Sequence, residues 1–445
     1  MNMNKEKEWY LANFAAFEKK LNGGARTPLH QLRKAALQRV EKNGFPSVRE
    51  EEWRFTNVSS IESTKFNPVD AEEQKEINRS TLQEYLFEDL TPNRLVFVNG
   101  RFSSQLSSLS DLAQNIKFDN LALELKNNQD ILLPHLAKHA DYKKHAFTAL
   151  NTAFLSEGAF IYIPKNIVVE EPLYILYISM DSGESFVTHP RNLYIIEANA
   201  QVKIIESYVG FGQEKYFTNP VSEIVLAENA IVDHYKIQRE NKSAYHIAVT
   251  QVNQKKDSNY TSNSFSYGSA LARNDISTVL DGEGAECTLN GLYMANGKQH
   301  VDNHTLIDHA KPHCNSHELY KGILDDRARA VFGGKIHVRP DAQKTDAIQS
   351  NQNLILSEDA TVDTKPQLEI FADDVRCTHG GTVGQLDDDG VFYLRSRGID
   401  KQYARNIMIQ AFAGQVTHKI KLEGLREKMD DLVFSRLHDG HLSDN

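Results

Sequence analysis

A short turn phrase recurs through the middle of the chain and limits what it can fold into more than any other feature. Each copy is a two-residue polar turn, then an alanine, then an apolar residue two positions later. The copies are Glu157-Gly158-Ala159, Ala198-Asn199-Ala200, Glu228-Asn229-Ala230, Glu283-Gly284-Ala285 and Glu358-Asp359-Ala360. A β-sandwich also favours Gly, Asn and Asp in its turns, and the copies are unevenly spaced. The constant place of the alanine favours the stacked coils of a β-solenoid.

Short β-branched or aromatic runs lie between these turns, for example Phe160–Ile163 and Leu193–Ile196. Such runs, bounded by polar turns, are typical of strands. We therefore expect a mainly β fold with a parallel β-helix, or β-solenoid, over residues 158–398. We expect residues 1–157 to form a mainly helical domain with a little β, in which Thr27 caps a helix.

Helical patterns return in a C-terminal helical segment, residues 399–445. Asp400 can cap a first helix that carries Ile407 and Phe412, and a second helix carries Leu422, Leu425 and Met429 on one apolar face. Such faces can cap the end of a solenoid. A terminal helix pair can equally serve as a docking element for a partner.

Composition narrows the class of protein. Fifty basic and sixty acidic residues give a net charge of −10, which opposes binding to a nucleic acid backbone. The sequence has neither a secretory leader nor eighteen consecutive apolar residues, so we expect a cytoplasmic protein without a membrane segment. Three cysteines without a C-x-x-C pair exclude a disulfide framework.

Five of the seventeen histidines fall between His300 and His317. Imidazoles on one strand face could bind iron or zinc, which would fit a metal-dependent enzyme built in a β-solenoid. Same-face histidines four residues apart on one strand lie about 13 Å apart, and Pro312 interrupts the pattern. Histidines with hydrogen-bonded structural roles are therefore the alternative.

Cys377 and His379 are two residues apart, so on a strand they share a face. A thiolate and an imidazole could together bind iron or zinc, or act as a nucleophile with its base. A buried cysteine beside a structural histidine is the plainer interpretation. The segment from Gly291 to Lys298 fails the spacing of a phosphate-binding loop, so we expect no nucleotide on this chain.

Several motifs, in their order along the chain, resemble the core motifs of the SufB/SufD family, the scaffold subunits of the SUF iron–sulfur cluster assembly machine. They are Ser316–Gly322, Phe332–Ile336, Ala342–Ala347, Lys365–Ile370, Asp373–Thr382 and Phe392–Gly398. The stretch from Glu52 to Thr56 is similar to the family's N-terminal signature. The D-type branch has glycine after the histidine that matches His379, where the B-type branch has an acidic residue. Gly380 therefore favours the D-type branch.

The resemblance implies a right-handed parallel β-helix between helical segments, and a non-catalytic scaffold. It implies a complex with a SufB-type paralogue and a SufC-type ATPase that grips the C-terminal helices, with Ile407, Phe412, Leu422, Leu425 and Met429 as candidate contacts. It also implies that His379 lies at the interface with the SufB-type subunit and helps to hold a transient iron–sulfur cluster or its iron. Cys377 is a second candidate ligand there. A homodimer of the isolated chain through the same edge is a further possibility, and flavin association of the complex stays open.

Overall fold

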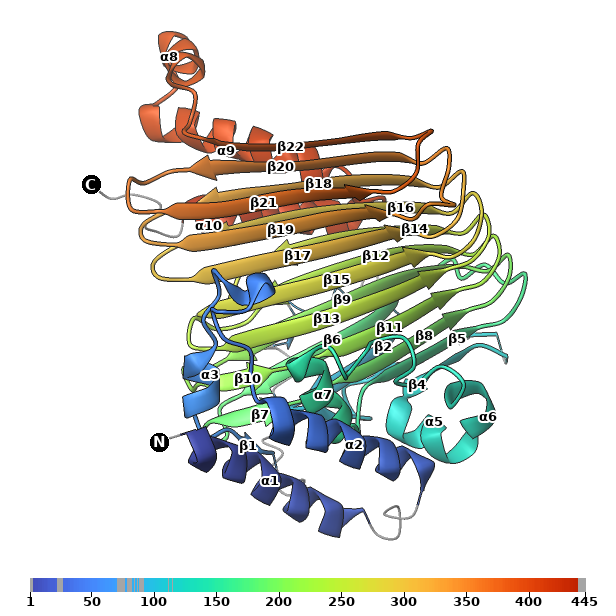
Figure 1. The fold of residues 1–445 in the computed structure, drawn as a ribbon. Coiled ribbons are helices and arrows are strands. Elements are labelled where there is room, and N and C mark those ends of the chain that lie inside the picture. Colours follow the sequence, from blue (N-terminus) through green and yellow to red (C-terminus); the bar gives the residue numbers. More distant parts are fainter. Residues whose placement is uncertain are drawn as a thin grey trace.

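Two long sheets wind around a common axis and form a parallel β-helix (Figure 1). The structure is a computed structural model that describes residues 3–21, 27–69, 77, 82–83, 85, 87, 92–110, 112–113 and 115–438. Within these residues the solenoid has about 8 turns, sheet A has 12 strands and sheet B has 10. Through most of the stack, each coil adds one strand to each sheet. The parallel β-helix predicted from the turn phrase is confirmed.

The strands of each sheet follow one another in space along the helix axis. The main path of sheet A is β21 (Thr361–Ile370), β19 (Arg329–Val338), β17 (His300–His309), β15 (Leu271–Leu280), β13 (Tyr245–Gln254), β11 (Val221–Leu226), β8 (Arg191–Ile196), β5 (Ala159–Ile163) and β4 (Lys117–Asn120). Three short strands branch from it, namely β1 (Asn67–Pro68), β7 (Phe186–Thr188) and β10 (Tyr216–Thr218). Sheet B is β22 (Arg376–Gly384), β20 (Asp346–Ile355), β18 (Asn315–Leu324), β16 (Glu286–Ala295), β14 (Asn259–Ser266), β12 (Ile231–Arg239), β9 (Gln201–Phe211), β6 (Leu173–Met180), β2 (Asn93–Val98) and β3 (Arg101–Phe102).

Helices gather at the N-terminal end of the stack and in the C-terminal part of the chain (Figure 1). The N-terminal ones are α1 (Met3–Lys20), α2 (Pro28–Asn43), the 3-10 helix η2 (Glu51–Trp53), α3 (Ser59–Ser63), α5 (Leu121–Asn127), α6 (Gln129–Leu132) and α7 (Ala146–Ala153). The C-terminal ones are α8 (Asp388–Ser396), α9 (Lys401–Thr417) and α10 (Glu423–His438). No helix in the described ranges is both long enough and apolar enough to cross a membrane.

The predicted caps are confirmed. The Thr27 side chain accepts a hydrogen bond from the backbone N–H of His30 at the start of α2, and Asp400 accepts from Gln402 at the start of α9. Strands β2, β3 and β4 precede residue 158 yet pair within the two sheets, and α8 starts at Asp388. The division of the chain at 157/158 and 398/399 stays a prediction.

One edge of the β-helix is built from turns in which a left-handed residue precedes a small buried one. Asn199 has φ 59° and Asn229 has φ 57°, and the alanines that follow, Ala200 and Ala230, are fully buried. Asparagine tolerates this conformation because its short polar side chain can hydrogen-bond locally. The backbone N–H of Asn199 donates to the carbonyl of Glu228 in the next coil, at 2.9 Å. Each turn thus helps to set the register of its neighbour.

The other predicted corner alanines are also buried, but not all lie at one edge. Ala285 stands between β15 and β16, at the same edge as Ala200 and Ala230. Ala360 stands between β20 and β21, at the opposite edge. The phrase therefore marks tight corners in general, because both edges need a small residue where the chain turns inward.

Five polar side chains connect the N-terminal segment to the outer face of sheet A. The Thr56 hydroxyl donates to Asp302 Oδ2 at 2.5 Å, and Arg273 donates to the same oxygen at 2.8 Å. His304 lies between two carboxylates, with Nε2 3.0 Å from Asp302 Oδ1 and Nδ1 3.3 Å from Glu52 Oε2. We call this group of five residues the N-terminal clamp.

Charge and shape both hold the clamp in place. Burial alone would lower the pKa of His304, but the Asp302 charge and hydrogen bonds to Asp302 and Glu52 raise it to about 9, against the smaller opposing charge of Arg273. The Arg273 guanidinium stacks 3.7 Å from the centre of the Trp53 ring. A Cβ at Gly333 would lie 2.7 Å from the His304 ring, so this glycine leaves room for the imidazole.

Replacing a corner alanine should overpack the neighbouring coils. Ala230→Leu places a large side chain at a fully buried position, and we expect it to lower the free energy of unfolding by about 1–3 kcal/mol. Glu228→Leu, on the exposed side of the same turn, is the matched control and should leave stability nearly unchanged. Thermal unfolding followed by circular dichroism measures both, and equal melting curves for the two variants would contradict the corner assignment.

The clamp predicts a pH dependence with a defined sign. The pKa of His304 is about 9 in the folded chain against 6.5 ordinarily, so its stabilisation is complete below pH 6.5 and is lost as pH rises through 9. His304→Gln should lower the free energy of unfolding at pH 6 by at most about 3 kcal/mol, and the deficit should shrink at alkaline pH.

Urea unfolding at pH 6 and pH 10, followed by tryptophan fluorescence, tests this dependence. His337→Gln is the control, because His337 forms a more exposed contact with Glu369, at 3.2 Å, on the same outer face. A deficit for His304→Gln that does not change with pH would show that the clamp does not depend on a charged imidazole.

Candidate functional site

The last coil leaves one end of the β-helix open. Among the described strands, β21 pairs within sheet A only with β19, and β22 pairs within sheet B only with β20 (Figure 1). Most side chains of β22 are exposed, whereas β20 beneath it is mostly buried or half-buried. An edge strand presents unpaired backbone donors and acceptors, so this end is suited to pairing with a strand of another molecule.

Cys377 and His379 lie on β22, with their side chains on the lumen side of the strand. The register pairs Cys377 with Ala347 and His379 with Gln349, both of which are buried inward-facing positions. Cys377 is half-buried against an apolar cluster that includes Ala347, and its burial raises the pKa of the thiol. His379 is exposed. The structure therefore brings the two predicted residues onto one face, with the imidazole the more accessible.

The lumen beneath β22 is polar. Gln349 Nε2 donates to Glu318 Oε2 at 2.7 Å, and these side chains are 1% and 2% exposed. Burial raises the pKa of Glu318 to about 7. The Tyr293 hydroxyl donates to Asn353 Oδ1 at 2.6 Å, and Asn353 donates to Asn351 at 2.7 Å. This network could not be predicted from the sequence, because polar residues at alternate positions of β18 and β20 resemble the solvent face of an ordinary strand.

The C-terminal helices cover the outer face of sheet B. Leu425 and Met429 are fully buried in an apolar cluster that α9 and α10 share with strands of sheet B. Ile407, Phe412 and Leu422 are half-buried. The predicted apolar face thus holds the helices on the β-helix, and its half-buried members are the ones that remain within reach of a partner.

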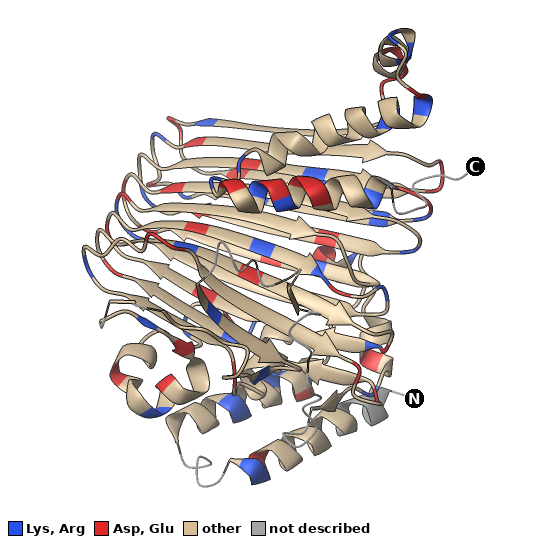
Figure 2. Ribbon diagram, turned by 180° about the vertical axis from the view of Figure 1, so that it is seen from behind, with Lys and Arg blue, Asp and Glu red and all other residues tan. Residues whose placement is uncertain are grey.

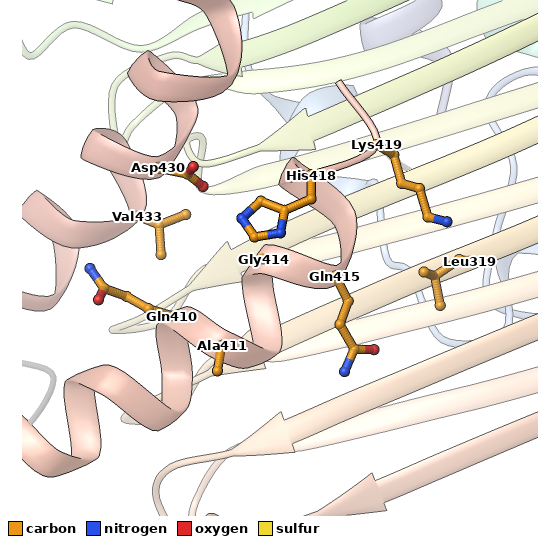
Figure 3. Close-up of a pocket in the computed structure, with 9 residues that line it drawn as sticks. All are labelled: Leu319, Gln410, Ala411, Gly414, Gln415, His418, Lys419, Asp430 and Val433. Carbon is orange, nitrogen blue, oxygen red and sulfur yellow. The ribbon is translucent and has the colours of Figure 1, made fainter. Parts of the chain in front are cut away.

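A pocket of about 880 Å³ lies between α9, α10 and sheet B (Figure 3). His418, at the end of α9, points toward Val433 and Asp430 of α10. The residues that line the pocket are Leu319, Gln410, Ala411, Gly414, Gln415, His418, Lys419, Asp430 and Val433. Figure 2 shows α10 crossing in front of the sheet with acidic and basic residues along its length.

Helix α8 projects beyond the last coil (Figure 1). Phe392 and Tyr393 on this helix are 69% and 56% exposed. Exposed large aromatic side chains are enriched at sites of protein association. Because α8 begins at Asp388, shortly after β22 ends at Gly384, these aromatic side chains belong to the same end of the molecule as the open edge.

The five histidines between His300 and His317 do not form one site. His300 and His304 lie on the outer face of sheet A, where they contact Thr56 or Glu52 of the N-terminal segment. His309 is fully buried in the lumen, and burial lowers its pKa to about 4. The others are on different surfaces, namely His313 in a turn and His317 exposed on sheet B. In the described part of the chain, no three His, Cys, Asp or Glu side chains are grouped so that they could hold a metal ion.

Comparison with known proteins gives the family. Residues 178–412 match the SufBD core domain of SUF system FeS cluster assembly, and residues 3–175 match the SufBD protein N-terminal region. An iron–sulfur cluster assembly SufBD family protein of Synechocystis sp. is 35% identical over 88% of this chain and 87% of its own length. The iron–sulfur cluster assembly protein SufD of Escherichia coli is 33% identical over 91% of this chain and 92% of its own length. Protein ABCI7, chloroplastic, of Arabidopsis thaliana is 30% identical over 90% of this chain and 84% of its own length. With both parts of the chain matched, the protein belongs to the SufBD family of the SUF iron–sulfur cluster assembly system.

Proposed function

We propose that this chain is a SufD-type scaffold subunit that works with a SufB-type partner and a SufC-type ATPase in iron–sulfur cluster assembly. The observation that carries the proposal is the last coil, with two edge strands and the exposed His379. The similarity to a relative named SufD, over 91% of this chain, supports the D-type assignment. In this proposal, the SufB-type partner adds its own strands to β21 and β22.

His379 is the residue that we propose contacts the cluster or its iron. A neutral imidazole is a good ligand for iron. Cys377 is the weaker candidate, because the thiolate binds metal and burial raises the pKa of this thiol. Two donors are fewer than an iron–sulfur cluster usually takes, so the partner would supply the rest. A cluster held by few ligands from each side is suited to transfer, which is what a scaffold requires.

The proposed role is that of a non-catalytic subunit, with nucleotide hydrolysis on the ATPase. We propose that the ATPase binds the surface of α9 and α10, around Ile407, Phe412 and Leu422 and the pocket between the helices. Leu425 and Met429 would contribute indirectly, because they fix α10 on the sheet. ATP-driven movement of these helices would then be transmitted to β18, because α9 contacts this strand.

A second copy of this chain is the competing occupant of the open end. Edge strands pair by backbone hydrogen bonds that carry little sequence information, so a homodimer could use β21 and β22 when the SufB-type partner is absent. A metal-dependent enzyme is not favoured, because the five histidines between His300 and His317 are divided among several surfaces and only His300 and His304 share one.

Removing the imidazole should abolish cluster formation and leave assembly of the complex intact. We expect His379→Ala to fold and to bind both partners, because the side chain is exposed and lies at the end of the stack. Complexes purified without oxygen after co-expression of all subunits should lose most of their iron and visible absorption. Cys377→Ala should lose less.

His317→Ala is the matched control for this experiment, because His317 is an exposed histidine of sheet B away from the last coil. It should keep the iron content of the wild type. Iron content and spectrum in the His379→Ala complex equal to those of the wild type would remove His379 from the proposed site.

A bulky charge in the pocket between the C-terminal helices should weaken capture of the ATPase. Ala411 is exposed on α9 and lines this pocket, so Ala411→Arg should lower affinity at least about tenfold without changing the melting curve. Glu358→Arg, on an exposed turn at the edge of the β-helix, is the control and should bind normally. Equal affinity of both variants in a binding titration would place the ATPase elsewhere.

A further inference from the structure

Three side chains stand in register at the open end, on successive strands of sheet B. Glu318 on β18 pairs with Gln349 on β20, and Gln349 pairs with His379 on β22. Glu318 and Gln349 are buried, whereas His379 is exposed. Neighbouring parallel strands lie about 4.8 Å apart, so Gln349 occupies the position between Glu318 and the proposed iron ligand in the register of the sheet.

The amide of Gln349 is held in one orientation. Its Nε2 donates to Glu318 Oε2 at 2.7 Å, and a carboxyl group keeps an acceptor oxygen for this bond in either protonation state. Gly334, on sheet A across the lumen, leaves the space that the amide occupies, since a Cβ there would lie 2.3 Å from Nε2. While Glu318 is ionised, the glutamine cannot turn its nitrogen toward β22 without losing this buried hydrogen bond, because a carboxylate cannot donate to the amide oxygen.

In this orientation the amide oxygen of Gln349 is left without a donor. Gln349 Oε1 is buried and has no hydrogen-bond partner within the described residues. A buried acceptor without a donor costs about 1–3 kcal/mol. The neighbour on the open side is His379, an exposed side chain whose ring is free to change rotamer on a fast timescale.

Histidines that bind metals usually donate their second ring N–H to a carbonyl or carboxylate oxygen, which fixes the tautomer and the orientation of the ring. We propose that Gln349 is the positioning residue of His379. Its Oε1 accepts a hydrogen bond from one ring N–H of the free chain, and the other ring nitrogen faces the open end. Glu318 and Gly334 act through the amide by holding its orientation. The assignment of the second nitrogen to iron rests on the proposed function, but the hydrogen bond does not.

The hydrogen bond can be tested on the full chain without metal or partners. Long-range ¹H–¹⁵N spectra of deuterated protein with ¹⁵N-labelled histidine report the tautomer of each imidazole, and His379→Ala identifies the signals of His379. We expect one tautomer in the wild type and a mixture of both in Gln349→Met, which removes the acceptor at similar volume. Gln352→Met, on the outer face of the same strand, should leave the single tautomer unchanged.

Gly334→Ala is the second variant, because it displaces the amide without removing it, and it should also give a mixture. It keeps the test decisive if Gln349→Met does not fold. A mixture already present in the wild type, or a single tautomer that persists in both variants, would overturn the proposal.

Iron content separates this inference from the proposed function. If His379 binds iron, the complex with Gln349→Met should hold iron about 10–100 times more weakly, as is usual when the partner of a metal-binding histidine is removed. A tautomer that responds to Gln349→Met, in a chain whose His379→Ala variant keeps its iron, would support the hydrogen bond and contradict the role of His379.

Discussion

The hydrogen-bonded register between successive coils is the constraint on which the rest of this structure depends. Inside each sheet a strand is paired to the coil before it and to the coil after it, and the turns are joined in the same way, as between Asn199 and Glu228. The pattern has no internal reason to stop, because each coil offers the next the same donors and acceptors. The last coil must therefore be covered by helices, or by another molecule. Here α9 and α10 cover the outer face of sheet B, and the edges of β21 and β22 remain available.

The same register explains the pairing of glycines with large side chains in the lumen. Gly291 lies beside Tyr320 and Gly322 lies beside Tyr293, and in each case a Cβ would come within 2.3 Å of the ring. Close to the open end, Gly334 leaves room for the side chain of Gln349 in the same way. Next to it, Gly333 leaves room for His304 on the outer face. Two adjacent glycines thus serve opposite faces of β19, because side chains alternate along a strand. One supports the N-terminal clamp and the other supports the polar network under His379.

The sequence was sufficient to predict what depends on local pattern. The turn phrase predicted the β-helix, Thr27 and Asp400 predicted helix starts, and the spacing of Cys377 and His379 predicted a shared face. What depends on packing could not be predicted. The burial of Leu425 is set by sheet B, which is distant in sequence.

Polar residues in the lumen escaped prediction for a related reason. Alternation along β20 does not reveal which face is inside, so Gln349 could not be distinguished from Gln352. The histidines between His300 and His317 show the same limit. Strand β17 places His300 and His304 on its outer face and His309 in the lumen, and the chain then turns into β18 before His317. Proximity in the sequence was a poor guide to proximity in a fold made of two opposed sheets.

The proposed function requires a SufB-type partner to cover the open end of the β-helix by strand pairing. Hydrogen–deuterium exchange of the full chain, with and without that partner, measures whether it does. In the free chain the amides of β22 that do not pair with β20 should exchange fast, and addition of the partner should slow them by orders of magnitude. The turn that holds Asn229 should not change. Exchange in β22 that stays as fast in the complex as in the free chain would show that the partner binds elsewhere and does not pair with this edge.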